Sequence, residues 1–226
     1  MTIHYHGTPI TPRTVMMTLA GRFFCVSHAD PRDVDLAHQI GQGVMLDNGA
    51  FSAWRVGRQV DWNGYYAWSE PWLDWHTTWA VIPDVIDGSE AENDALILQW
   101  PHGTSGAPVW HLHESIDRLK RLAHEWPRIC LGSSGRWRNV GTDAWRAKMD
   151  EAMNALCGNG PPPTWLHMLR GMRLSGDRYP FSSIDSADIA RNHNGHRDPI
   201  KMANRWDSLQ CPGRWIMAPS QHFIGF

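Results

Sequence analysis

Short apolar runs alternate with longer stretches of helical periodicity along the whole chain. Continuous apolar runs are typical of strands buried in a parallel sheet, whereas apolar positions three and four residues apart indicate helices. Strands are predicted over 23–28, 43–47, 79–84, 107–112, 128–132, 164–169 and 181–185, with an eighth near 214–218. Helices are predicted over 31–40, 63–75, 90–100, 114–125, 142–157 and 198–209. This alternation predicts a parallel sheet with crossover connections.

The number of strand–helix units indicates the fold class. Seven or eight units in 226 residues predict an α/β fold, a compact (β/α)8 TIM-like barrel, with an open doubly wound sheet as the alternative. The chain is long enough for one large core and short for two, so we expect a single barrel domain over residues 1–226. The sequence contains no GxGxxG or Walker pattern, which argues against dinucleotide and P-loop sites.

The cysteines and the apolar runs indicate the redox environment and the compartment in which the protein is expected. Cys25, Cys130, Cys157 and Cys211 are far apart, so we expect no Cys-based zinc site and no dense disulfide framework. Cys25 and Cys130 lie within apolar runs and are interpreted as buried free thiols, which fits a reducing cytosol. No apolar stretch approaches the length of a membrane span and the N-terminus lacks a signal-peptide pattern, so we expect a cytoplasmic protein without a membrane partner.

The formal net charge of −2 conceals an asymmetry between two parts of the chain. Residues 1–126 hold 8 Lys and Arg against 15 Asp and Glu, whereas residues 127–226 hold 13 against 8. The basic part is where a polyanion partner is expected to bind. An asymmetry of this size also arises by chance, and this alternative stays open.

Three of the predicted strands end in an aspartate: Asp47, Asp84 and Asp185. In a β/α barrel the functional groups lie where the strands end, so these residues predict a carboxylate-lined pocket with acid/base or nucleophilic chemistry. The alternatives are a helix cap for Asp47 and a solvated carboxylate for Asp84. Ser182, Ser183 and Ser186 are expected to hydrogen-bond Asp185 and keep it ionised, and Arg191 is expected to pair with it or to bind a phosphate.

Other polar residues lie near the same strand ends. Asn48-Gly49-Ala50 lets the backbone approach a ligand closely, and Phe51 is expected to form one wall of a flat slot. His111 and His113 share one face of a strand; such a pair can bind a metal, but it is more often hydrogen-bonded within a barrel, and we expect no metal site. Asp188 is interpreted as a helix-start residue. The loop 191–197 is either a phosphate contact or a solvated segment.

These segments, taken in chain order, resemble the tRNA-guanine transglycosylase superfamily. Residues 46–51 are similar to its Asp-Ser-Gly-Gly-Phe segment, Pro83-Asp84 to its base-recognising aspartate, residues 132–135 to its Gly-rich turn, and Asp185 with Arg191 to its Asp-x5-Arg nucleophile segment. The resemblance covers most of residues 1–206. It is closest to the short phage-encoded relatives that insert 7-deazaguanines into DNA, through segments 4–10, 83–89, 109–114 and 166–171.

The resemblance implies base exchange without an external cofactor. Asp185 would be the nucleophile that attacks C1′ and expels guanine, and Asp47 would be the general acid/base. Double displacement retains the anomeric configuration. The implied base-binding residues are Asp84, which would hold the purine edge, Phe51, which would stack on it, and their neighbours Asn48, Gly132, Ser133, His111 and Gly171.

The resemblance also implies the partners. These are DNA and a 7-deazaguanine base such as the cyano (preQ0-like) or aminomethyl form, with an accessory protein as an open addition. A target nucleotide in a duplex would have to be flipped out. The expected backbone contacts are Arg191, Arg197, Lys201 and Arg205, which follow the Asp185 strand. The host cytoplasm would be the location of a phage-encoded enzyme.

The chain departs from the tRNA enzymes at several points. It is much shorter, and in place of their C-terminal Cys/His zinc site it has only Cys211 with scattered histidines. Asn48 replaces their Ser, and Arg170 precedes Gly171 where Met is expected. Three alternatives therefore stay open: the same chemistry on RNA, an N-glycosidase or deoxyribosyltransferase acting on free nucleosides, and a non-catalytic nucleic-acid-binding barrel.

Overall fold

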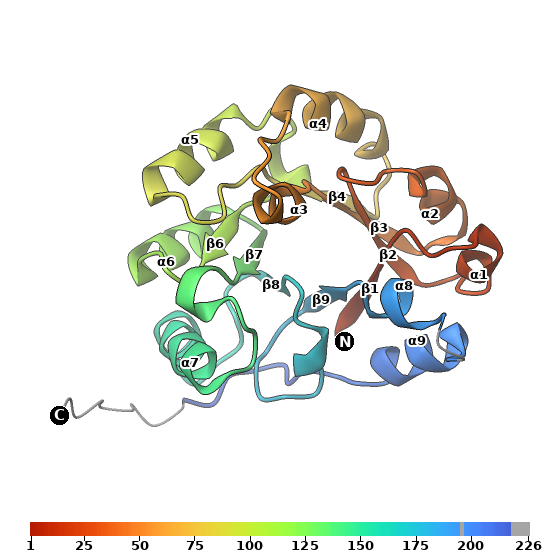
Figure 1. Cartoon of the computed structure of the whole chain (residues 1–226). Coiled ribbons are helices and arrows are strands. Elements are labelled where there is room, and N and C mark those ends of the chain that lie inside the picture. The colour runs from red at the N-terminus through yellow and green to blue at the C-terminus, as the bar shows by residue number, and fades with distance from the viewer. Residues whose placement is uncertain (195–196, 218–226) are drawn as a thin grey trace.

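A ring of parallel strands surrounded by helices forms the centre of the molecule (Figure 1). The computed structural model describes residues 1–194 and 197–217. Its strands are β1 (Ile3–Gly7), β2 (Phe23–Ser27), β3 (Gly43–Asp47), β4 (Thr78–Val81), β5 (Gly106–Ala107), β6 (Val109–His111), β7 (Arg128–Gly132), β8 (Trp165–Met168) and β9 (Ser183–Ser186). The hydrogen-bonded order is β5-β4-β3-β2-β1-β9-β8-β7-β6, with every pairing parallel. The expected barrel is confirmed, and the open doubly wound sheet is not what forms.

Pro108 divides the strand that closes the ring. β5 pairs with β4 on one side, and β6 pairs with β7 on the other. Proline has no backbone N–H to donate to a ladder, but the Pro108 carbonyl still accepts from Cys130 N at 2.8 Å. The segment predicted as one strand over 107–112 is therefore two short strands in one position, and nine strands fill the eight places of the barrel.

The first strand of the barrel is β1, which the apolar pattern did not predict. β1 lies between β2 and β9. It alternates Ile3 and Tyr5 with His4 and His6, whose rings bond Ser175 and Asp207 outside the ring. The eighth strand expected near 214–218 is wrong for the described residues 214–217, which form no strand; residue 218 lies outside the described residues.

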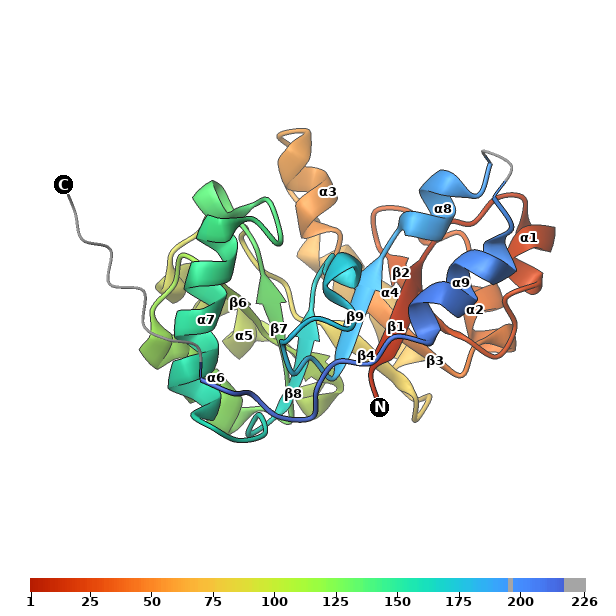
Figure 2. The ribbon, with the colours of Figure 1, turned by 90° about the horizontal axis from the view of Figure 1, so that it is seen from below.

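The helices lie outside the ring in chain order. They are α1 (Arg13–Met17), α2 (Val34–Ile40), α3 (Ala50–Arg55), α4 (Trp62–Ser69), α5 (Glu90–Gln99), α6 (Ile116–Glu125), α7 (Asp143–Cys157), α8 (Asp188–Asn192) and α9 (Pro199–Asp207), with 3-10 turns η1 (Glu70–Trp72), η2 (Gly103–Ser105), η3 (Gly135–Trp137) and η4 (Met172–Leu174). None of those in the described residues is long and apolar enough to cross a membrane. Figure 2 shows α3 and α8 at one end of the barrel and the N-terminus at the other.

The long helices agree with the apolar periodicity and the short ones do not. α5, α6, α7 and α9 lie within their predicted ranges, while 63–75 divides into α4 and η1. Helix 31–40 begins only at Val34, so Pro31 is not its first residue. α1, α3 and α8 have five or six residues each, too few turns for a period of 3.6 to be recognised.

The core has an inner and an outer part. Inside the ring, Tyr5, Met45, Trp79 and Cys130 pack together with their neighbours. Two larger clusters fill the space between strands and helices, one on the β2–β4 side and one on the β7–β9 side. Cys25 and Cys130 are buried and free, as predicted, and burial raises the pKa of both thiols well above the usual range.

Candidate functional site

A pocket lies where the strands end, beside α3. Its walls come from the ends of β3, β4, β6, β7 and β8. The lining residues are Asp47, Asn48, Ala50, Phe51, Val81, Asp84, Ile86, His111, Gly132, Ser133, Leu169 and Arg170. Seven of these residues were singled out from the sequence. We call this the carboxylate pocket; Asp185 lies next to it on β9.

Asp47 is the last residue of β3 and lies partly covered in the pocket wall. Ser27 Oγ on the neighbouring strand donates to Asp47 Oδ2 at 2.6 Å, and Gly49 N donates to the same oxygen at 3.2 Å. Burial raises the Asp47 pKa to about 6, and the charges of Asp185 and Asp84 act in the same direction, while the Ser27 and Gly49 hydrogen bonds oppose them. A carboxyl group with this pKa exchanges protons near neutral pH.

The turn after Asp47 places Phe51 in the pocket. Gly49 has φ of +77° immediately before α3, and a Cβ there would lie 3.1 Å from Ala29 N. Glycine adopts this left-handed conformation without steric cost. The turn lets α3 begin at once, so that Phe51 falls in its first turn and stacks on Trp54 with 5.7 Å between ring centroids.

Asp84 is held by two side chains from neighbouring strand ends. Asn48 Nδ2 donates to Asp84 Oδ1 at 2.7 Å, and His111 Nε2 donates to Asp84 Oδ2 at 2.8 Å. Asp84 is only 5% exposed. Each carboxylate oxygen has a second lone pair, so Asp84 can still accept hydrogen bonds from the N–H edge of a ligand. The solvated alternative for Asp84 is wrong.

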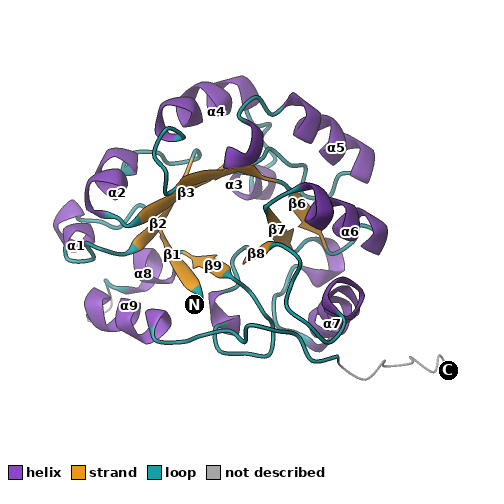
Figure 3. Cartoon of the chain, turned by 180° about the vertical axis from the view of Figure 1, so that it is seen from behind, coloured by secondary structure: helices purple, strands orange, loops and turns teal. Residues whose placement is uncertain are grey.

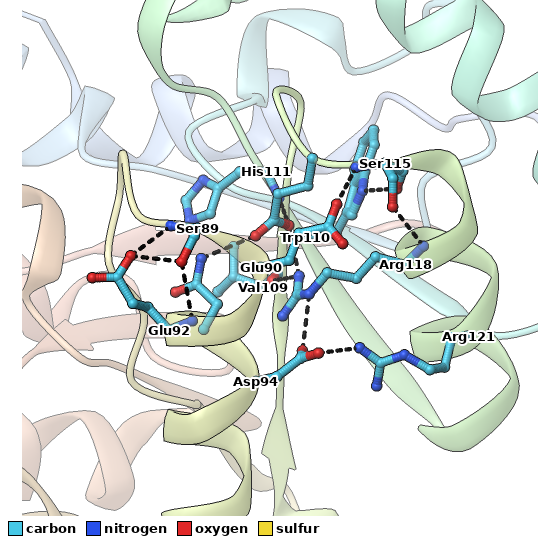
Figure 4. Close-up of polar contacts among 12 residues, drawn as sticks. Ser89, Glu90, Glu92, Asp94, Val109, Trp110, His111, Ser115, Arg118 and Arg121 are labelled. Carbon is cyan, nitrogen blue, oxygen red and sulfur yellow. Dashed lines mark hydrogen bonds and ion pairs between the residues drawn. The ribbon is translucent and has the colours of Figure 1, made fainter.

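A hydrogen-bonded network behind the pocket holds the backbone of Val85, next to Asp84, and of His111. Val85 N donates to Asn93 Oδ1 at 2.8 Å, and Asn93 Nδ2 donates to Glu114 Oε1 at 2.9 Å. His111 N donates to Glu114 Oε2 at 2.8 Å, and Arg118 Nη1 donates to the same oxygen at 2.6 Å. Arg118 Nε also donates to Asp94 Oδ1 at 3.0 Å, and Arg121 donates to the other oxygen of Asp94 (Figure 4).

Asp185 lies on β9 and is bonded through one oxygen only. Arg170 N donates to Asp185 Oδ1 at 2.7 Å, and His167 Nε2 lies 3.3 Å from the same oxygen. A carboxylate oxygen accepts, so the contact with Asp185 places the ring proton of His167 on Nε2. Ser183 Oγ, which accepts from Trp165 Nε1 at 2.7 Å, then donates to His167 Nδ1 at 2.8 Å. No described residue donates to Asp185 Oδ2. This oxygen is therefore free to form a bond.

The guanidinium of Arg170 spans one side of the carboxylate pocket, from Phe51 to Ser133. It lies 3.8 Å from the centroid of the Phe51 ring, and its Nη2 donates to Ser133 O at 2.7 Å. Arg170 is also the one non-glycine residue with positive φ in the described chain, at 57°. Burial lowers its pKa, and Asp185, Asp47 and Asp84 oppose that effect. With the arginine in place the remaining cavity is about 30 Å³, roughly one water molecule.

Some predicted interactions differ in the structure. Ser182, Ser183 and Ser186 do not donate to Asp185: Ser183 acts through His167, and Ser186 Oγ accepts from Asp188 N. No ion pair joins Arg191 to Asp185 in the described chain. The reason is direction, since Arg191 is exposed on α8 while Asp185 faces the ring. Asp188 does begin α8, as expected.

The other predicted residues lie around the pocket or away from it. Gly171 is buried beside the pocket but does not line it, and a Cβ there would lie 2.2 Å from Met168 Cγ. Arg191, Arg197, Lys201 and Arg205 are all exposed. Arg205 lies over its neighbour Trp206 at 4.9 Å.

His111, the last residue of β6, and His113, two residues further on, are hydrogen-bonded rather than arranged for a metal. Their rings stack with 5.6 Å between centroids, and His113 uses both nitrogens on Ser134 Oγ and Gly88 O. Within residues 1–194 and 197–217 no three His, Cys, Asp or Glu side chains are grouped to hold a metal ion. The zinc site of the tRNA enzymes therefore has no counterpart around Cys211 in this part of the chain.

Sequence reasoning missed the contact of His167 with Asp185, the contacts of Arg170 with Phe51 and Ser133, and the network of Asn93, Glu114 and Arg118. His167 stands in a strand where period-2 alternation places it on the same face as Trp165 and inside the ring, so its direction could have been inferred. The others depend on contacts between distant segments. Comparison of the chain with family models, with curated proteins and with solved structures found no match.

Proposed function

We propose that this protein is a base-exchange transglycosylase that replaces guanine in DNA with a 7-deazaguanine base. The observation that carries the proposal is the meeting of three carboxyl groups in different environments at one end of the barrel. Asp185 has a free oxygen, Asp47 has a pKa of about 6, and Asp84 is fixed by Asn48 and His111. Carboxyl groups whose environments differ in this way can take separate acid, base and nucleophilic roles.

Asp185 is the proposed nucleophile. Its Oδ2 forms a bond to C1′ of the target nucleotide while the bond from C1′ to N9 of guanine breaks, and the electron pair leaves with the base. The Arg170 N–H and the His167 ring hold Oδ1 and fix the plane of the carboxylate. The incoming base then attacks C1′ and releases Asp185, so two inversions retain the configuration.

Asp47 is the proposed proton carrier between the two halves of the reaction. In its protonated form it donates a proton to the departing guanine, and the resulting carboxylate accepts a proton from the incoming base. A pKa of about 6 gives both forms useful populations near neutral pH. Ser27 and Gly49 fix the orientation of this carboxyl group.

Asp84 and Phe51 are the proposed recognition elements for the purine. Asp84 accepts hydrogen bonds from the N–H groups of a guanine-like edge, as carboxylates do with amino donors of bases. Phe51 stacks on the base, and this requires the Arg170 guanidinium to withdraw, because it occupies the same ring face. Both the leaving and the entering base have a guanine-like edge, so one pocket serves both half-reactions.

The exposed cations favour a polymer over a free nucleoside. Arg191, Arg197, Lys201 and Arg205 follow β9 on and around α8 and α9, and all are exposed. Figure 2 shows α8 at the same end of the barrel as α3. Phosphates on either side of a flipped nucleotide would lie near this surface. DNA in the host cytoplasm is the proposed substrate, with or without an accessory protein.

The test is the fate of guanine in a defined duplex. The protein is incubated with a DNA duplex and the cyano form of 7-deazaguanine, and the DNA is digested to nucleosides for mass spectrometry. We expect the deoxynucleoside of the supplied base, with one free guanine released for each insertion, and no exchange by Asp185→Asn. Exchange only in an RNA stem, or only in free deoxyguanosine, would contradict the DNA assignment. Guanine release without insertion would identify a glycosidase.

A further inference from the structure

A second cavity lies at the opposite end of the barrel, where the strands begin. Figure 3 views the ring of strands from the side opposite to that of Figure 1. The cavity has a volume of about 360 Å³, against about 30 Å³ for the carboxylate pocket. Its lining residues are Ile3, Tyr5, Phe23, His76, Thr77, Thr78, Trp79, Thr104, Ser105, Arg128 and Trp165. A volume of this size is typical of small-molecule sites.

Arg128, the first residue of β7, supplies the only Lys or Arg charge in this lining. Its guanidinium lies 4.5 Å from the Trp79 ring centroid and 5.5 Å from that of Trp165. Its Nε is fully buried without a hydrogen-bond partner. None of the side-chain hydrogen bonds or ion pairs of residues 1–194 and 197–217 involves the guanidinium. Two indole faces therefore hold this cation, and no carboxylate neutralises it.

An uncompensated cation in such a position is costly. Burial lowers the pKa of Arg128, which is the direction that loss of hydration gives. Cation–π contacts offset only about 0.5–2 kcal/mol of that cost. An oxyanion would supply both the missing charge and acceptors for the guanidinium N–H groups. The surrounding Thr77, Thr104 and Ser105 add hydroxyl donors, whereas the Thr78 hydroxyl already donates to His38 Nε2. Phe23 and Ile3 add apolar surface.

We propose that this cavity is a binding site for a small organic oxyanion, a carboxylate or a phosphate monoester, with Arg128 as its counter-charge. A phosphate ion alone would leave most of the cavity empty, whereas a ligand with a flat apolar part beside its anionic group would use the aromatic and aliphatic walls as well. The site does not depend on the proposed base exchange, because it shares no lining residue with the carboxylate pocket.

Isothermal titration calorimetry of the whole protein tests the site with three probes: inorganic phosphate, adenosine 5′-monophosphate and benzoate. We expect one binding site per chain, tighter for at least one organic anion than for phosphate. Arg128→Gln should weaken that binding at least tenfold. Arg58→Gln removes the same charge from an exposed residue that lines neither cavity, and it should bind like the wild type.

Two further measurements keep the test decisive if Arg128→Gln does not fold. Ser105→Asp places a negative charge in the lining and should abolish binding of all three anions. In the wild type, the NMR signal of the Arg128 Nε–H group should move on addition of the tightest anion. Equal binding by wild type, Arg128→Gln and Ser105→Asp, or an unmoved Arg128 signal at saturation, would overturn the proposal, as would no binding of any probe.

Discussion

The hydrogen-bond partners of Asp47, Asp84 and Asp185 differ, and these differences suggest a separate chemical role for each carboxyl group. Asp47 bonds a hydroxyl and a backbone N–H and has a raised pKa, whereas Asp84 uses one oxygen on Asn48 and the other on His111. Asp185 keeps Oδ2 free. Residue types and strand ends could be read from the sequence. The partners could not, because Ser27, His111 and His167 come from other strands.

Asp47→Asn is expected to slow base exchange by about 10²–10⁴. In the proposed first half-reaction the protonated carboxyl donates to guanine, so guanine release by the wild type in a single turnover should fall as pH rises above about 6. The variant should lack this limb of the pH profile. Rapid-quench measurement of guanine release between pH 5 and 8 checks both points, and an unchanged limb in the variant would contradict the assignment.

The pH dependence of the free energy of unfolding tests the raised pKa of Asp47 independently of activity. Its folded-state pKa of about 6 lies above the usual 3.8, so between these values the folded protein holds a proton that the unfolded chain releases. The free energy of unfolding therefore falls as pH rises from about 4 to about 6, by roughly 3 kcal/mol at most and less for a partly exposed group. Asp47→Asn should exceed the wild type in stability at pH 7.5, and the gap should close toward pH 4. A purely structural cap would instead lose stability on this substitution.

Arg170→Ala is expected to strengthen binding of the free base. The guanidinium covers the Phe51 face on which the base is proposed to stack, so binding there must first displace a cation–π contact of about 0.5–2 kcal/mol. Removing it should lower the Kd about 2- to 30-fold in equilibrium titration. Arg136→Ala breaks a similar contact, with Trp137 at 4.1 Å, outside the pocket lining, and should leave the Kd unchanged. Weaker binding by Arg170→Ala would mean that the arginine contacts the bound base.

At the scale of elements, α5 and the turn after β6 fix the pocket from behind. Asn93 on α5 connects Val85, next to Asp84, to Glu114, which in turn holds the backbone of His111. The sequence predicted α5 over 90–100, and in the structure Ser89 and Glu92 form a capping box at its start. It could not predict the cross-link, since a helix pattern says only which face is buried, and Asn93 looks like an ordinary polar residue.

Asn93→Ala is expected to impair base binding through position rather than chemistry. It removes three hydrogen bonds, two to the backbone of Val85 and one to Glu114. Val85 N and Glu114 are left with unsatisfied groups, at a cost of about 1–3 kcal/mol in stability. The KM for the free base should rise more than kcat falls. Ser89→Ala is the matched control on the same helix: loss of the cap costs about 0.5–2 kcal/mol and should leave the KM unchanged. Equal kinetic effects of both variants would contradict the positioning role.

At the scale of the whole molecule, the apolar pattern of the sequence predicted the barrel but not all of its strands. Alternation of strands and helices was sufficient to predict the barrel, because seven of its eight strand positions overlap segments that the sequence predicted as strands. β1 was not predicted, because His4 and His6 interrupt the apolar run. The eighth strand was instead predicted near residue 214. The division of one strand position at Pro108 was not predicted either. It is recognised only from the pairing of β5 with β4 and of β6 with β7.

The basic surface of the C-terminal part is expected to hold the DNA backbone. Each phosphate neutralised on a duplex contributes about −0.9 to the slope of log K against log salt. Arg191→Ala combined with Lys201→Ala should therefore weaken DNA binding and reduce the slope by about 1.8, without altering competition by free bases. Lys120→Ala removes an exposed cation from α6 on the other side of the ring and should leave the slope unchanged (Figure 1). An unchanged slope in the double variant would exclude this surface.

The covalent intermediate on Asp185 is the most direct test of the account. The protein is mixed with a guanine-containing duplex without an incoming base, denatured, and examined by intact mass spectrometry and peptide mapping. We expect a denaturant-stable adduct whose mass equals protein plus DNA minus guanine, mapped to Asp185 and absent in Asp185→Asn, whose fold should be retained because the Asn amide oxygen can still accept from Arg170 N. Wild-type turnover without an adduct, an adduct on another residue, or near-normal turnover by Asp185→Asn would contradict the account.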